Sequence, residues 1–133
     1  MKAPATYKLH QPTVRLDAKY RQVLADGRGQ VWLATSQGIV ASDGEDWWHT
    51  FDRFDGMPYE DLLCLAFAQN GDLWAGTSEG AWRLRAGKFT YFWGKRWLPG
   101  NLVSGLLPQD DGSILLATDG GVEIGRASCR ERV

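Results

Sequence analysis

Short apolar runs separated by turn residues recur three times along the chain. Val23–Val40 reads VLADGRGQVWLATSQGIV, Leu65–Trp82 reads LAFAQNGDLWAGTSEGAW, and Leu106–Glu123 reads LLPQDDGSILLATDGGVE. Each segment has an apolar run, a turn rich in Gly, Asp or Asn, a second apolar run that ends in Thr, and a Gly before the next apolar residues. Runs this short, rich in Val, Leu and Trp, predict β-strands joined by tight turns. We therefore expect an all-β protein.

The spacing of the repeat points to one architecture. Thr35, Thr77 and Thr118 follow one another at steps of 42 and 41 residues, and a Gly lies three residues after each Thr. A repeat of about 41 residues with four short strands is typical of a β-propeller blade. We predict a partial β-propeller of about three consecutive four-stranded antiparallel blades, the last of them incomplete.

The repeat also predicts how the chain divides. Residues 1–19 are a lead-in or the end of a preceding blade, 20–60 the first blade, 61–101 the second, and 102–124 part of a third. In the second blade we expect strands over residues 62–68, 73–77, 81–84 and 88–92. A tight hairpin turn at Asn70–Gly71 would join the first two strands, since both residues accept positive φ.

The repeated Thr and Gly residues have a structural interpretation. Each Thr ends a strand just before a turn, so its hydroxyl can bond the turn backbone. The Gly that follows would take positive φ or allow a close backbone approach. Trp32 and Trp74 recur at the same repeat position, which predicts packing between neighbouring blades. Much of the content of 16 Gly and 7 Trp is therefore accounted for by the repeat.

The end of the chain departs from the repeat. The sequence GRASCRERV, residues 125–133, is basic, matches nothing upstream, and corresponds to the translation of a common sequencing adapter. We interpret it as a non-native tail; the alternative is a natural basic tail. The tail contributes a net charge of +2, so the rest of the chain carries −3 rather than −1.

Composition excludes several classes of protein. With 44% apolar residues among 133 and a net charge of −1, the chain suits a folded soluble domain rather than a disordered one. Its basic residues are not clustered, which argues against nucleic-acid binding. No apolar stretch is long enough for a membrane span, and no signal peptide is visible at the N-terminus.

The sequence offers no constellation of catalytic residues. The only two histidines, His10 and His49, lack metal-ligand spacing. Cys64 lies inside the apolar run LLCLAFA, where a thiol packs as a small apolar side chain. The acidic turn at 110–112 lacks the alternating ligands of a calcium loop. We predict a protein that is not an enzyme and that uses no cofactor or metal.

The candidate ligand site lies in the two longest loops, which connect successive blades. The first contains Arg53 and Tyr59, and the second contains Trp93, Lys95, Arg96 and Trp97. Exposed aromatic rings beside Arg or Lys suit stacking on a sugar or a contact with a protein. We take Arg53, Tyr59, Lys95, Arg96 and Trp97 as candidate ligand-binding residues. The alternative is that the rings cover the blade edge and the charges are only solvated.

Three segments match a known repeat: DGRGQVWLATSQGI at 26–39, NGDLWAGTSEGA at 70–81 and DDGSILLATDGGV at 110–122. Together with Gly56-Met57-Pro58 before the next strand, they resemble the two-component regulator propeller repeat family. The third segment departs from the pattern, with Leu115 in place of Trp.

The resemblance implies the ligand-sensing propeller of a bacterial signal-transduction receptor, periplasmic or extracytoplasmic. Its partners would be an oligosaccharide or other small ligand, further blades, and a signalling domain in the full-length protein. A protein-interaction scaffold is the alternative function. A propeller lyase or hydrolase is less favoured because no His or carboxylate cluster stands out.

Overall fold

The computed structural model describes residues 18–42 and 48–125. The predicted lead-in up to residue 17 and the predicted tail beyond residue 125 lie outside the described residues. The elements are β1 (Tyr20–Ala25), β2 (Val31–Thr35), β3 (Gly38–Ser42), β4 (Trp48–Phe51), the 3-10 helix η1 (Arg53–Asp55), β5 (Leu62–Phe67), β6 (Leu73–Thr77), β7 (Gly80–Arg85), β8 (Lys88–Phe92), β9 (Val103–Pro108), β10 (Ile114–Thr118) and β11 (Gly121–Gly125).

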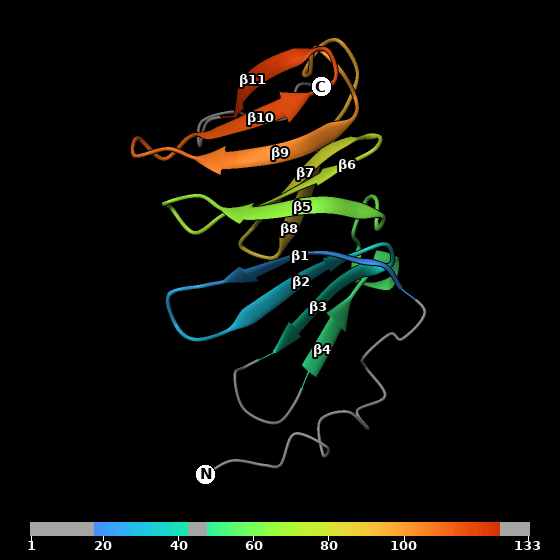
Figure 1. The fold of residues 1–133 in the computed structure, drawn as a ribbon, viewed down its shortest axis with the longest axis vertical. Coiled ribbons are helices and arrows are strands. Elements are labelled where there is room, and N and C mark those ends of the chain that lie inside the picture. The colour runs from blue at the N-terminus through green and yellow to red at the C-terminus, as the bar shows by residue number, and fades with distance from the viewer. Residues whose placement is uncertain (1–17, 43–47, 126–133) are drawn as a thin grey trace.

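These strands form three antiparallel sheets stacked face to face (Figure 1). The strand orders are β1-β2-β3-β4, β5-β6-β7-β8 and β11-β10-β9, so within each sheet every strand pairs with its neighbour in sequence. Short turns between adjacent apolar runs favour this meander. The third sheet has three strands within the described part of the chain. The expectation of an all-β, partial propeller is confirmed.

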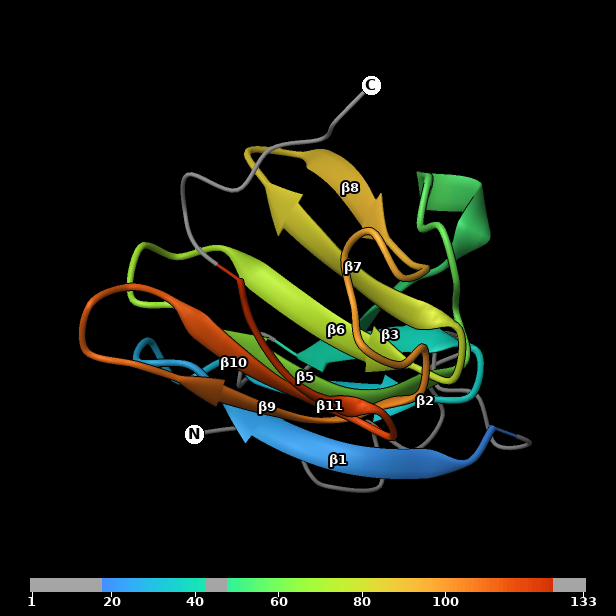
Figure 2. The same ribbon diagram turned by 90° about the horizontal axis from the view of Figure 1, so that it is seen from above.

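The first strands of the three sheets lie side by side. Strand β5 contacts both β1 and β9, and Figure 2 shows the three on one side of the stack with β8 on the other. Each first strand has a register shift near its start, between Tyr20 and Gln22, between Leu62 and Cys64, and opposite Ala117 and Thr118. Such a bulge adds twist to a strand, and here it recurs with the repeat.

Apolar side chains fill the space between neighbouring sheets. Between the first and second sheets, Ala34 and Ile39 meet Leu65 and the ring of Trp82, which is 0% exposed. Between the second and third sheets, Trp74 packs with Ile114 and other apolar residues. Burying each large apolar side chain contributes roughly 1.5–3 kcal/mol. The predicted packing role of Trp32 and Trp74 is confirmed, since each belongs to one of these clusters.

The strand predictions agree with the structure more closely than the turn prediction does. In the second sheet the expected strands match β5 to β8 within one residue at each end. The tight turn at Asn70–Gly71 is present, with the Ala68 N–H bonded to the Asp72 carbonyl at 2.9 Å, but of its two residues only Gly71 has positive φ, 95°. The turn therefore has three residues, 69–71, with the last in the left-handed conformation, and it matches the twist of the two strands as a two-residue turn would.

Strand β11 reaches Gly125, the first residue of the predicted tail, which pairs with Ile114. Backbone pairing does not depend on the origin of a residue, so the tail interpretation stays a prediction. The blade limits also stay predictions, because they fall in the connections between sheets and hydrogen-bonded pairing does not fix them.

Candidate functional site

One side of the stack is built from two kinds of segment. The β2–β3 and β6–β7 turns lie there, together with the crossover segments 52–61 and 93–102 that connect successive sheets. The Gly38 N–H donates to the Glu60 carbonyl at 2.6 Å, and the Gly80 N–H donates to the Asn101 carbonyl at 2.6 Å. Each turn is therefore bonded to the crossover that follows it. We call this side the crossover face.

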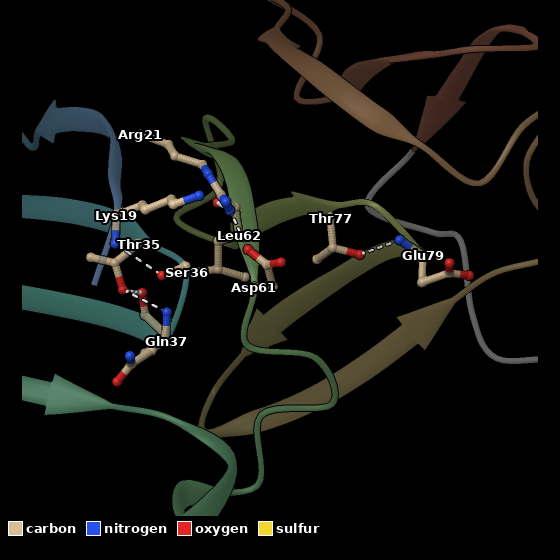
Figure 3. A network of polar contacts seen from close by, with 10 residues as sticks. Lys19, Arg21, Thr35, Ser36, Gln37, Asp61, Leu62, Thr77 and Glu79 are labelled. Carbon is tan, nitrogen blue, oxygen red and sulfur yellow. Dashed lines mark hydrogen bonds and ion pairs between the residues drawn. The ribbon is translucent and has the colours of Figure 1, made fainter. Parts of the chain in front are cut away.

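The repeated Thr residues hold the turns of the crossover face. The Thr77 hydroxyl donates to the Gly80 carbonyl at 2.9 Å and accepts from the Glu79 N–H at 3.0 Å. Thr35 makes the same two bonds within its own turn. Gly80 has φ of 115°, a conformation that favours glycine. The predicted roles of these Thr and Gly residues are confirmed, and Figure 3 shows two of the turns.

An ion pair joins the first two sheets at the crossover face. Nη1 of Arg21, the extra residue of the β1 bulge, pairs with the Asp61 carboxylate and donates to the Leu62 carbonyl at 3.1 Å (Figure 3). Close by, the Lys19 N–H donates to Ser36 Oγ at 2.9 Å. The start of the second sheet is thereby fixed against the first.

The first crossover presents Arg53 already engaged. Its backbone N–H and guanidinium both bond the Glu60 carboxylate, at 3.0 and 2.8 Å. The guanidinium also lies 4.7 Å from the centre of the Phe54 ring, which is 81% exposed. The helix η1 holds this arrangement through a capping box between Asp52 and Asp55. Arg53 can therefore stabilise the loop as well as contact a ligand.

Tyr59 lies closer to the core than Arg53 does. Its half-buried ring packs on the cluster between the first two sheets, and its carbonyl accepts from the Trp82 indole N–H at 2.9 Å. Burial raises the pKa of the Tyr91 phenol, and the charges of Glu79 and of an ionised Tyr59 add to that rise. Both tyrosines pack against the same cluster, although Tyr59 comes from the first crossover and Tyr91 from β8.

The second crossover begins with an exposed ring. Trp93 is 59% exposed and stacks on Tyr91, with ring centres 6.5 Å apart and planes at 28°. The Tyr91 hydroxyl donates to the Glu79 carbonyl, which anchors the pair to the β6–β7 turn. Lys95 and Arg96 are exposed, and neither forms an ion pair with any of the described residues.

Trp97 lies closer to the core than the other candidate residues of this loop. It is half-buried, and its ring meets Phe92 edge to face at 5.2 Å. The Trp97 and Leu98 N–H groups both donate to the Gly94 carbonyl, at 3.0 and 2.9 Å, which makes the loop compact. Beneath it is a cavity of about 30 Å³ lined by Trp74, Phe92, Trp97, Leu98, Leu116, Glu123, Ile124 and Gly125. That volume suits about one water molecule and is too small for a sugar ring.

The five predicted residues therefore share one face but differ in availability. Lys95 and Arg96 are free to meet a ligand, Arg53 is shared with Glu60, and Tyr59 and Trp97 expose only part of each ring. Sequence reasoning placed Trp93 in the loop without selecting it, and it missed Tyr91. The signal that could have found the pair is their i, i+2 spacing, which puts both side chains on one side of a strand end.

Other titratable groups have structural explanations. Burial alone would raise the pKa of Asp72, but the hydrogen bonds and charge of Arg85, with help from Asn70 and the charge of Arg83, hold it below its ordinary value. Burial raises the pKa of the Cys64 thiol to about 11, against a smaller opposing effect of the Gly76 N–H. Over residues 18–42 and 48–125, no three His, Cys, Asp or Glu side chains are grouped as a metal site.

A groove of about 380 Å³ lies away from the crossover face, between the ends of the first strands. Its lining consists of Gln22, Leu24, Ala25, Asp26, Gly27, Leu65, Ala66, Phe67, Leu106 and Pro108. Its walls carry one carboxylate and no cation, so it has little of the chemistry predicted for the ligand site. None of the helical residues that the structure describes forms a segment long and apolar enough to cross a membrane.

No family model and no curated protein matches the sequence. Solved structures do match. The extracellular domain of a hybrid two component system from B. thetaiotaomicron has a TM-score of 0.71 and 24% identity, over 82% of this chain and 16% of that domain. A second such domain from the same organism has a TM-score of 0.71 and 20% identity, over 89% of this chain and 17% of that domain.

The chain forms blades of a β-propeller. This is the fold that the resemblance to the two-component regulator propeller repeat implies. The blades are also similar to virginiamycin B lyase from Staphylococcus aureus, with a TM-score of 0.63 and 14% identity, over 87% of this chain and 44% of the lyase. At these identities the likeness establishes the fold alone.

Proposed function

We propose that these blades belong to the extracytoplasmic sensor of a signal-transduction receptor and bind an oligosaccharide or another small ligand at the crossover face. The observation that supports the proposal most is the likeness to two extracellular domains of two component systems. Further blades and a signalling domain of the same receptor would then be partners of this segment. The proposed activity is binding rather than catalysis.

The chemistry of the crossover face suits such a ligand. The stacked rings of Tyr91 and Trp93 offer a flat apolar surface, on which a sugar can lay its C–H face. Lys95 and Arg96 follow after Gly94 and offer charged donors for hydroxyl or anionic groups. Arg53, Tyr59 and Trp97 complete the candidate set, with Tyr59 and Trp97 supporting the surface from below.

A binding experiment on the 133-residue chain tests the proposal. A glycan array with neutral and acidic oligosaccharides finds a ligand, and calorimetry then compares Trp93→Ala and the double variant Lys95→Ala/Arg96→Ala with the original protein. We expect about a tenfold loss of affinity for each, equivalent to about 1.4 kcal/mol. Lys88→Ala is the matched control, because Lys88 is also exposed but lies at the β7–β8 turn.

The outcome separates the candidate functions. Ligand binding that none of the crossover variants weakens would reject this face as the site. The scaffold alternative is favoured by one observation, the exposed Phe54 ring with Arg53 stacked on it, since such pairs recur at protein interfaces. Under that alternative no glycan binds, and Phe54→Ala abolishes capture of a protein partner.

A further inference from the structure

Large apolar side chains are exposed at the two ends of the stack of blades. On β1, Val23 is 64% and Tyr20 is 43% exposed. On the third sheet, Leu107 is 58%, Val122 is 64% and Ile124 is 41% exposed. The first and third sheets form opposite ends of the stack (Figure 1).

The repeat explains what the exposed residues of β1 are built to contact. Val23 pairs with Leu33 at the ladder position where Leu65 pairs with Ala75 in the second sheet. Leu65 is 1% exposed, because it lies in the core between the first and second sheets. In the second sheet, this apolar pattern packs on the preceding sheet. The outer face of the first sheet carries the same pattern, so it is built to pack on a preceding blade.

The exposed residues of the third sheet are counterparts of the opposite half of the interface. Val122 follows Ala81 by one repeat, and Leu107 follows Ala66. Ala81 and Ala66 are 0% and 4% exposed, because they lie in the core between the second and third sheets. The outer face of the third sheet thus carries the pattern that receives a following blade.

A backbone hydrogen bond repeats with the same geometry. The Gly38 N–H bonds the Glu60 carbonyl, and the Gly80 N–H bonds the Asn101 carbonyl. One repeat later the donor is Gly121, and one repeat earlier the acceptor is Ala18. Gly121 and Ala18 lie at opposite ends of the stack. One chain therefore carries both the N–H donor and the carbonyl acceptor for a third hydrogen bond of this kind, which would form between two copies.

We propose that two copies of this chain dock head to tail, with the third sheet of one copy packed on the first sheet of the other. The partner is a second copy, because an interface of this kind needs matching apolar residues and a Gly N–H donor at the repeat positions. One face of this chain carries each half of that set, so a second copy supplies what the first lacks. The contact continues an interface that the chain already contains twice. Since the two faces differ, the pairing is heterologous. The proposal concerns the 133-residue chain and does not depend on ligand binding at the crossover face; in a longer polypeptide, the further blades would compete with a second copy for the same two faces.

The test blocks one face at a time in the 133-residue chain. Val23→Asp blocks the first face and Val122→Asp blocks the second, in each case by placing an unpaired carboxylate in the interface. Either change should raise the dissociation constant about a hundredfold or more. Both side chains are exposed, so circular dichroism should show both variants folded. Phe54→Asp, an exposed apolar residue on neither face, is the control.

Sedimentation velocity then gives distinct results for each sample. The original protein and the Phe54→Asp control should associate, and each face variant alone should be monomeric. An equimolar mixture of Val23→Asp and Val122→Asp should form a 1:1 dimer, since one intact pair of faces remains. A monomeric original protein would leave both faces to neighbouring blades of one polypeptide and overturn the proposal. Association of either variant alone, or a mixture that stays monomeric, would also overturn it.

Discussion

Replacing Thr77 by Val isolates the contribution of the turn hydroxyl, because the two side chains have nearly the same shape. In Thr77 the hydroxyl oxygen takes part in two hydrogen bonds, to the Gly80 carbonyl at 2.9 Å and from the Glu79 N–H at 3.0 Å. The side chain is 0% exposed, so water cannot replace either bond. A methyl group there leaves a buried carbonyl without its donor.

The expected loss follows from the number of bonds and their burial. A net contribution of roughly 0.5–1.5 kcal/mol for each buried bond gives about 2 kcal/mol for Thr77→Val. Thr118 makes the same two bonds, at 2.7 and 3.1 Å, but in a solvent-exposed turn. Water can replace them there, so Thr118→Val should cost less than about 1 kcal/mol.

Urea unfolding followed by tryptophan fluorescence measures both losses. With a slope of roughly 1–2 kcal/mol per molar, Thr77→Val should lower the midpoint by about 1 M or more. Both substitutions belong in the Val23→Asp/Val122→Asp background, so that self-association does not add to the measured stability. Thr35→Val should resemble Thr77→Val, since Thr35 is also 0% exposed. Equal midpoint shifts for Thr77 and Thr118 would refute the reasoning.

Two further predictions concern titratable groups. Because the pKa of Asp72 is lower in the folded state than its ordinary value of 3.8, its pairing with Arg85 stabilises the fold above that pH and is lost on acidification through the folded pKa. Asp72→Asn should flatten the stability curve in this range, measured as urea midpoints between about pH 5 and 2. An unchanged curve would contradict the assignment. In a Cys129→Ser variant, which leaves Cys64 as the one cysteine of the sequence, Cys64 should react with a thiol reagent at pH 8 only after unfolding, because burial raises its pKa to about 11; prompt labelling of this native variant would contradict the buried position of Cys64.

The fold was open to prediction from sequence because its information is local and periodic. Each strand depends on an apolar run and on the turn residues beside it. The repeat of about 41 residues shows the same pattern three times in one sequence. The Thr77 and Gly80 turn was predictable for the same reason, since both bonds of the Thr hydroxyl lie within three residues. The conformation of Asn70 within its turn was not, because Asn is also compatible with negative φ and the sequence does not give the hairpin register.

The candidate site was predictable only as a set of loops. Trp93 and Trp97 lie four residues apart in one crossover, and nothing in the local sequence says which ring is exposed. That choice depends on Tyr91 stacking under Trp93 and on Phe92 meeting Trp97. Likewise, Tyr59 is partly buried because the Trp82 indole, 23 residues away, bonds its carbonyl.

The sequence by itself determined the repeat, the strands, the Thr-Gly turns and the side of the blades on which the long connections lie. Only the tertiary structure decided which loop side chains are available, and that the apolar residues at the two ends are counterparts of the internal interfaces. The physical reason is range. A strand or a turn is stabilised by residues a few positions away. The exposure of a side chain depends on the neighbouring blade, about 41 residues distant along the chain, or on a second chain.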